Sequence, residues 1–202
     1  MMRKPDMSDE KTAATLVQIA RHSLEIFVRE GTRHEPTLAD LPELLQEPGA
    51  SFVTLTDHGR LRGCIGNTQA RWALARDVAR NAVSAASRDP RFPPVTAVEL
   101  ADIRLEVTIL TPPRLLPYTD FDDLCAKLRP GIDGVMLTWQ ERRGLLLPQV
   151  WRRIPQPAQF LEAITYKAGI PYRNLRHHPL SVEVHTFQAQ HFHEEGYQEP
   201  GD

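Results

Sequence analysis

The chain has 202 residues, of which 41% are hydrophobic and 25% are charged, and its formal net charge is −2. This composition is typical of a soluble globular protein built as one compact domain or as two small subdomains that share a core. The near-neutral charge argues against a nucleic-acid partner and against an anionic membrane surface. The absence of a long apolar run, the polar N-terminus and two widely separated cysteines predict a cytoplasmic protein with free thiols and no membrane span.

The N-terminal part of the sequence predicts one long helix. Residues 1–7 are polar and should be disordered. A helix is expected from Glu10 to Glu30, with Ser8 as its N-cap and Gly31 as its stop. The stretch that follows is rich in turn-forming residues and predicts a connector with one short helical turn.

The next segment predicts a β-hairpin followed by a helix. Strands are expected over Ser51–Asp57 and Arg60–Ile65, with a tight turn at His58 and Gly59. Beyond Gly66 the hydrophobic period changes to that of a helix. We expect this helix to begin at residue 67 or 68 and to end near Arg88.

The rest of the chain alternates between strands and short helices. The segment DPRFPPV should form a rigid bend, and ADIRLEVTIL has the alternation of a half-buried strand. A short helix, a hairpin around QERR and another helix should follow before the strand LSVEVHTF. These elements cover 121–128, 134–148, 158–168 and 180–187, and residues 189–202 should form a frayed tail. Antiparallel hairpins interspersed with helices indicate the α+β class.

The stretch LRGCIG is the strongest candidate for a functional site. Alternation along the strand places Leu61, Gly63 and Ile65 on one face, with Arg62 and Cys64 on the other. Leu61 and Ile65 should enter the core, so Cys64 should point away from it. A guanidinium beside the thiol would favour the thiolate, which makes Cys64 a candidate nucleophile. The alternative is that Cys64 is a small packing residue, since free cysteines are often buried. GCIGNT before a helix would also suit an anion.

Other polar residues are candidates for proton transfer or ligand binding. His185 and Glu183 share one face of the last strand, so His185 is a candidate general base. Glu106 shares a strand face with Arg104, either as an exposed pair or as a functional carboxylate. Lys167 lies near the buried stripe of its helix, where it either extends to solvent or contacts an anion. His191 and His193 would share one strand face, a geometry that can bind zinc or iron. The alternative, which we expect, is that the histidines near the C-terminus are solvated, so we predict no metal and no cofactor.

LRGCIG and three later motifs, taken together, are similar to the AMMECR domain family. The later motifs occur in the expected order, as DPRFPPV (89–95), LLLPQV (145–150) and FLEAITYKAGI (160–170). The resemblance runs from about Leu16 to Phe187 and implies one AMMECR-type domain over 8–188. It also implies an antiparallel sheet with flanking helices in two intimately packed subdomains, with the hexapeptide beside a cleft.

The resemblance also implies site residues and partners. The signature positions are Arg62, Gly63, Cys64 and Gly66, and the later motifs add Arg91, Phe92, Pro148, Gln149 and Lys167. Prokaryotic members are called protein A of the AmmeMemoRadiSam system, which implies a Memo-like partner related to dioxygenases and a radical SAM partner. The family supplies no established reaction.

Two hypotheses about function follow. In the first, a cleft binds a small anionic or carbonyl ligand, Cys64 is the nucleophile, Arg62 lowers its pKa, and His185 or Glu106 moves protons. In this hypothesis the ligand contacts are Gly63, Gly66, Arg91, Phe92, Gln149 and Lys167. In the second, the protein is a non-catalytic binding or adaptor protein that acts with the Memo-like and radical SAM partners.

Overall fold

The computed structural model describes residues 10–177 and 181–200 and has the predicted α+β class. The chain divides into two compact units. Unit 1 comprises residues 1–111 and 190–202, and unit 2 comprises residues 112–189. Each unit has its own antiparallel sheet and its own hydrophobic core. The predicted disorder of residues 1–7 and the predicted N-cap at Ser8 lie outside the described residues.

The sheet of unit 1 has the strand order β2-β1-β4-β9, and the short strand β3 pairs with the start of β1. Its bounds are Pro48–Asp57 (β1), Arg60–Gly66 (β2), Trp72–Ala73 (β3), Ile103–Leu110 (β4) and Ala189–His193 (β9). The predicted turn at His58 and Gly59 is confirmed, since both residues have positive φ angles, 48° and 75°.

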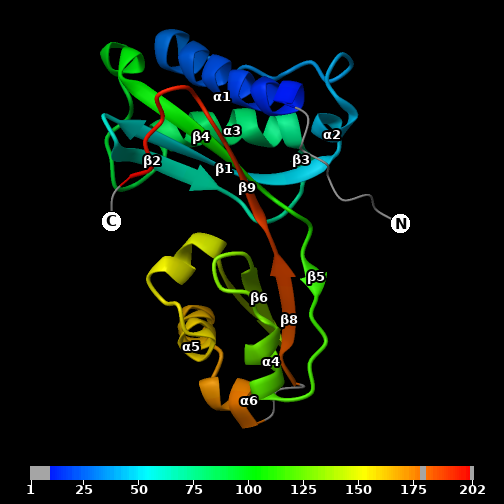
Figure 1. Ribbon diagram of the computed structural model, residues 1–202. Coiled ribbons are helices and arrows are strands. Elements are labelled where there is room, and N and C mark those ends of the chain that lie inside the picture. Colours follow the sequence, from blue (N-terminus) through cyan, green and yellow to red (C-terminus); the bar gives the residue numbers. More distant parts are fainter. Residues whose placement is uncertain (1–9, 178–180, 201–202) are drawn as a thin grey trace. The chain divides into compact units, whose positions relative to one another are not determined.

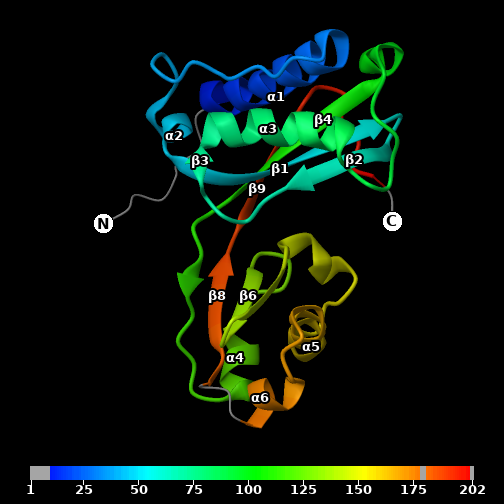
Figure 2. The same ribbon diagram turned by 180° about the vertical axis from the view of Figure 1, so that it is seen from behind.

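Two long helices cover one face of this sheet, as Figures 1 and 2 show. They are α1 (Glu10–Glu30) and α3 (Leu74–Ser87), and unit 1 also holds the short helices α2 (Glu43–Gln46) and η1 (Ala97–Ala101). Val53 and Leu55 of β1 alternate with Phe52 and Thr54, so only the first pair enters the core. The opposite face of the sheet therefore carries Phe52, Thr54 and their cross-strand neighbours.

A buried polar cluster joins the sheet of unit 1 to α3. The Asp77 carboxylate accepts hydrogen bonds from the backbone and hydroxyl of Ser51 at 2.9 and 2.7 Å. It also accepts from Asn67 at 2.6 Å and Asn81 at 3.0 Å. Burial raises the pKa of Asp77, and the hydrogen bonds from Ser51 and Asn67 and the charge of Arg80 oppose that effect.

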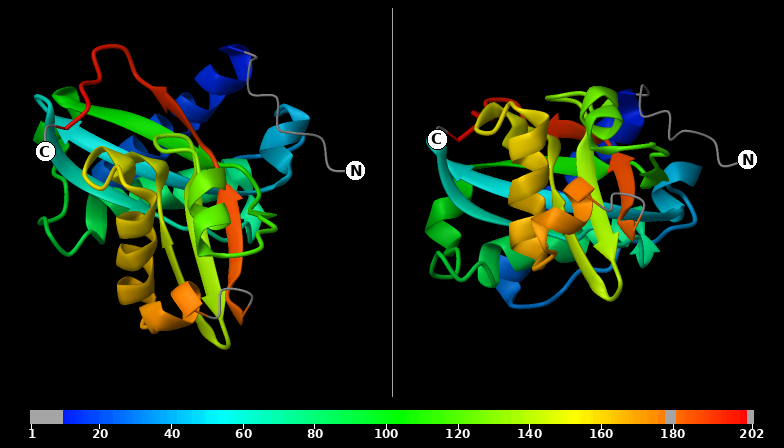
Figure 3. Two further views of the ribbon diagram at one scale, coloured as in Figure 1. Left: turned by 60° about the horizontal axis from the view of Figure 1, so that its bottom comes forward. Right: turned by 90° about the horizontal axis from the view of Figure 1, so that it is seen from below.

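Unit 2 has the strand order β5-β8-β6-β7 and its own set of helices (Figures 1 and 3). The strands are β5 (Arg114–Leu115), β6 (Gly134–Trp139), β7 (Arg142–Leu146) and β8 (Glu183–Phe187). The helices are α4 (Phe121–Lys127), η2 (Pro148–Arg152), α5 (Pro157–Ala168) and α6 (Tyr172–His177). Trp151 stacks on Phe160 at 3.7 Å between ring centroids, in the centre of the unit 2 core.

The prediction that a helix begins at residue 67 or 68 was wrong, because α3 begins at Leu74. Asn67 is held in the loop by its hydrogen bond to Asp77, and Trp72–Ala73 pair with Pro48 and Gly49 as β3. The segment GCIGNT therefore does not lead directly into a helix N-terminus, which removes the argument for an anion site there.

The C-terminal segment also differs from the frayed tail that we predicted for 189–202. Residues 189–193 form β9 beside β4, and Phe192 packs against the core of unit 1. Glu194 continues this pairing by donating its backbone N–H to Leu105 O at 3.0 Å. Tertiary contacts order this segment, although its own sequence has only weak strand character.

We expect Gly63→Ala to destabilise the protein. A Cβ on Gly63 would lie 2.2 Å from Ala85 O, so β2 and α3 would have to separate at a cost of about 3 kcal/mol. Gly31→Ala is the contrast, since Gly31 has φ +71° and open space around it, and should cost only about 1 kcal/mol. Urea unfolding of both variants measures the two costs, and equal costs would contradict the close packing at Gly63.

Candidate functional site

The strand that carries LRGCIG contains a β-bulge at Arg62. Leu55 pairs with Gly63, whereas Thr56 pairs with Leu61, so Arg62 is the extra residue. Directly opposed residues of two strands share a face, so Leu61 lies on the face of Thr56 and not in the core. The prediction that Leu61 fills the core was wrong for this reason. The prediction that Cys64 points away from the helices is consistent with its pairing to Thr54.

Four polar side chains, one from each long strand, lie across the helix-free face of the unit 1 sheet. Thr54 pairs with Cys64 on one side and with Glu106 on the other. On the next strand, His191 Nδ1 lies 3.2 Å from Glu106 Oε1. We call Cys64, Thr54, Glu106 and His191 the polar row. Strand pairing alone aligns its first three members.

Cys64 is half-buried and hydrogen-bonded through both its side chain and its backbone. Thr54 Oγ1 donates to Cys64 Sγ at 3.4 Å, and the Cys64 N–H donates to Asp89 Oδ2 at 2.8 Å. Burial is the largest influence on the thiol and raises its pKa, while the Thr54 hydrogen bond and the charge of Arg91 act in the opposite direction. Since the net effect is a raised pKa, the thiol is neutral near neutral pH and needs a base for nucleophilic chemistry.

Glu106 is fixed at the centre of the polar row. Its Oε1 atom accepts a hydrogen bond from Thr108 Oγ1 at 3.1 Å, and Thr108 Oγ1 also lies 3.2 Å from His191 Nδ1. The Glu106 side chain is only 14% exposed. A carboxylate with a hydroxyl donor and an imidazole beside it can accept a proton from a group on the sheet surface.

Arg62 does not act on the thiol as predicted. Its Nε donates to Glu99 Oε1 at 2.7 Å, and its Nη1 donates to Pro93 O at 2.9 Å. The bulge turns Arg62 toward this partner, and the Arg62 guanidinium lowers the pKa of Glu99 to about 2. The cation whose charge reaches Cys64 is Arg91.

Arg91 is held beside Cys64 by a buried carboxylate. Asp89 accepts hydrogen bonds from Arg91 Nε at 2.9 Å and from Arg91 Nη2 at 2.6 Å. The same carboxylate accepts from the backbone of Cys64, so it connects the DPRFPPV bend to β2. The Arg91 guanidinium lies 5.4 Å from the centre of the Phe92 ring, and the Arg91 side chain is 54% exposed. Arg91 is therefore oriented by Asp89 and still accessible to an anion.

The two glycines of the hexapeptide have packing roles. A Cβ on Gly63 would collide with Ala85 of α3, and a Cβ on Gly66 would lie 2.3 Å from the Phe52 ring. These contacts account for both glycines without a ligand.

The remaining predicted site residues lie in unit 2. His185 Nδ1 lies 3.4 Å from Glu183 Oε1 on β8, which agrees with the predicted pairing of these two residues on one face. Lys167 Nζ extends from α5 and donates to Leu145 O at 3.1 Å, and Gln149 is exposed in η2. Arg62, Cys64, Glu106, Arg91 and Phe92 all belong to unit 1.

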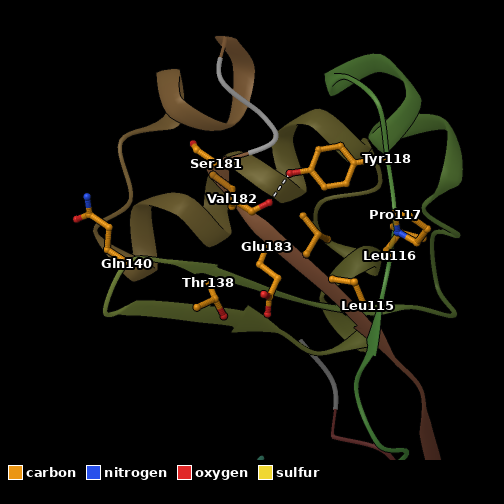
Figure 4. A pocket seen from close by; sticks show the side chains of 10 residues that line it. Leu115, Leu116, Pro117, Tyr118, Thr138, Gln140, Ser181, Val182 and Glu183 are labelled. Carbon is orange, nitrogen blue, oxygen red and sulfur yellow. Dashed lines mark hydrogen bonds between the residues drawn. The ribbon is translucent and has the colours of Figure 1, made fainter.

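Unit 2 also contains a pocket of about 470 Å³ that is lined in part by Glu183, the neighbour of His185 (Figure 4). Glu183 and Thr138, which pair across β8 and β6, lie between Gln140 and Leu115 in this view. Tyr118 closes one end, where its hydroxyl donates to Val182 O at 2.5 Å. The pocket offers one carboxylate and a few hydroxyl and amide groups.

Several residues of the site were not identified from the sequence. The alternation of SFVTLTD places Thr54 on the outer face of β1, so its position was predictable although its contact with Cys64 was not. Thr108 and Asp89 gave no such signal, because their roles depend on contacts between distant segments.

Two further findings limit the kind of site. Within residues 10–177 and 181–200, no group of three or more His, Cys, Asp and Glu side chains is arranged to hold a metal ion. In the same part of the chain, no helix has the length and apolar character needed to cross a membrane.

Comparison with known proteins places this chain in one family. The AMMECR1 family model matches residues 17–192. A protein of Methanothermobacter thermautotrophicus is 42% identical over 90% of this chain and 94% of its own length. A protein of Thermococcus onnurineus is 37% identical over 89% of each chain.

A solved structure agrees with the fold. The crystal structure of uncharacterized protein PH0010 from Pyrococcus horikoshii matches with a TM-score of 0.77 and 33% identity. The match covers 92% of each chain. The resemblance inferred from the four sequence motifs is thus confirmed.

We expect the Cys64 thiol to react slowly with iodoacetamide near neutral pH. Its reaction rate should continue to rise with pH above 9.0, the ordinary pKa of a thiol, because the pKa of Cys64 is raised. Arg91→Gln should raise the thiol pKa further, because it removes a charge that lowers it. Arg62→Gln is the matched control, since its guanidinium is paired with Glu99. Mass spectrometry of the Cys64 peptide over a pH series measures both effects, and a larger effect of Arg62→Gln would contradict the assignment.

The ion pair between Arg62 and Glu99 should make stability depend on pH. The pKa of Glu99 falls from 4.5 to about 2 in the folded state, so its contribution is present above 4.5 and is lost as pH falls toward 2. Glu99→Gln should therefore cost about 2 kcal/mol at neutral pH, with the difference from wild type shrinking in acid. Urea unfolding over this pH range tests this, with exposed Glu162→Gln as control, and a constant difference would contradict it.

Proposed function

The chain belongs to the AMMECR1 family, and from this premise we propose that unit 1 binds a small carbonyl compound with a negatively charged group, with which Cys64 forms a covalent bond. The observation that carries the proposal is the polar row, in which strand pairing aligns a half-buried thiol, a hydroxyl donor and a carboxylate. A ligand-binding role gives these polar groups a reason to share a face that the helices leave open.

The proposed step is addition of the thiol to the carbonyl carbon. A bond forms between Cys64 Sγ and that carbon, and the π electrons of the C=O bond move to its oxygen. The thiol proton passes to the Glu106 carboxylate, directly or through one water, and then to the new alkoxide oxygen. The product is a hemithioacetal, and the step needs no oxidant or cofactor.

Arg91 supplies the proposed recognition of negative charge. Asp89 orients its guanidinium, its side chain is 54% exposed, and its charge reaches Cys64. A carboxylate on the ligand would pair with Arg91 while the carbonyl carbon meets the thiol. Phe92, next to Arg91, is the proposed apolar contact.

His185, Gln149 and Lys167, which the sequence also suggested, belong to unit 2 and take no part in the proposed step. Glu106→Gln should slow adduct formation at Cys64, because it removes the proposed base. His185→Gln is the control variant and should leave the rate unchanged.

Glyoxylate, which combines an aldehyde with a carboxylate, is the probe that tests the proposal. We expect it to protect Cys64 from iodoacetamide, and Arg91→Gln should weaken this protection about tenfold. Propanal has no charge and should protect less at the same concentration. Cys125, half-buried on α4, is the internal control within the same molecule. Equal protection of both cysteines, or no protection of Cys64, would contradict the proposal.

The alternative function is that of a non-catalytic adaptor for Memo-like and radical SAM partners. An adaptor needs surface complementarity but no reactive thiol. Co-purification of these partners with wild type and with Cys64→Ser therefore separates the hypotheses, if it is combined with the glyoxylate measurement. Partner binding without any reaction at Cys64 would favour the adaptor.

A further inference from the structure

The C-terminal segment 194–198 is anchored firmly at its first residue. The Glu194 carboxylate accepts hydrogen bonds from Arg21 Nε at 2.6 Å and from Arg21 Nη2. It also accepts from the backbone of Leu105 at 3.1 Å, while its own backbone N–H donates to Leu105 O. This pair is largely buried, with side-chain exposures of 19% for Arg21 and 16% for Glu194. The chain therefore leaves β9 in a defined direction.

From this anchor the segment crosses to the β1–β2 turn at the far side of the unit 1 sheet. A methyl group on Gly196 would lie 3.6 Å from Arg104 Nε, which belongs to the outer face of β4. A methyl group on Gly59 would lie 2.7 Å from Gln198 Oε1, so the segment reaches the hairpin turn. Figures 1 and 3 agree on this path, which is drawn in red.

Tyr197 is the large side chain of this crossing. Its ring stacks on His193, with centroids 5.6 Å apart and planes 17° apart. Because Phe192 enters the core, His193 points to the same outer face as the polar row. The Tyr197 ring is half-buried, and burial together with the charges of Glu106, Glu199 and Cys64 raises the pKa of its phenol. The phenol is therefore neutral, and its stacking on His193 places the ring on the outer face that also carries the polar row.

We propose that segment 194–198 is a wall of the ligand site over the polar row and that Tyr197 limits the size of the ligand that reaches Cys64. The proposal rests on the proposed function in taking Cys64 as the group that a ligand must reach. It adds Tyr197 as a residue that determines specificity, and it narrows the substrate class to short-chain carbonyl compounds. A segment that is held by an ion pair at one end and lies against the hairpin turn at the other suits a fixed wall.

The test measures reaction of Cys64 with a small reagent, iodoacetamide, and a bulky one, N-phenylmaleimide, at the peptide level. Tyr197→Ala should accelerate the bulky reagent about tenfold and the small one less than about twofold, because it opens space without exposing the whole strand. Tyr197→Phe keeps the ring and should match wild type. Reaction at Cys125 in the same molecules is the internal control.

A second variant tests the segment without changing the Tyr197 ring. Glu194→Gln weakens the anchor and should accelerate both reagents at Cys64, since the whole segment then opens more often. Circular dichroism and thermal unfolding confirm that each variant is folded. An unchanged ratio of the two rates in Tyr197→Ala would overturn the proposal, whatever the effect of Glu194→Gln.

The outcomes also separate this inference from the proposed function. If glyoxylate does not protect Cys64 but Tyr197→Ala still accelerates reaction with the bulky reagent, the proposed function is wrong and the proposed wall is supported. If glyoxylate protects Cys64 and the rate ratio is unchanged in Tyr197→Ala, the proposed function stands and the wall is rejected.

Discussion

The β-bulge at Arg62 is the constraint on which the candidate site depends. It shifts the pairing of β2 by one residue between Leu61 and Gly63, which turns Arg62 toward Glu99 and keeps Cys64 aligned with Thr54. A regular strand would place Arg62 and Cys64 on the same face. In the bulged strand Arg62 is paired with Glu99, and Asp89 holds a different cation, Arg91, beside the thiol.

The resulting site combines a neutral thiol with charged groups that are already paired. Asp89 pairs with Arg91, and Glu106 contacts Thr108 and His191, so each charge has a fixed direction. In the proposed function, this arrangement would bind a polar ligand with little reorganisation of the protein. The pairing of these charges also makes their half-buried position tolerable, because an unpaired charge there would be costly.

The architecture was largely predictable because hydrophobic periodicity and turn chemistry are local. The helix Glu10–Glu30, the turn at His58 and Gly59, and the inward alternation of β4 follow from the sequence alone. The start of α3 and the strand β9 did not, because each depends on a distant partner. Asn67 is held by Asp77, and residues 189–193 are ordered by β4 and by the core under Phe192.

For the site, the sequence by itself determined the family and the outward direction of Cys64, and it suggested LRGCIG as the candidate. Only the tertiary structure decided that Arg62 pairs with Glu99, that Asp89 holds Arg91 beside Cys64 and that Tyr197 stacks on His193. The physical reason is that alternation along a strand is a property of neighbouring residues. Bulges, buried ion pairs and the path of a terminal segment are set by contacts between residues that the sequence separates widely.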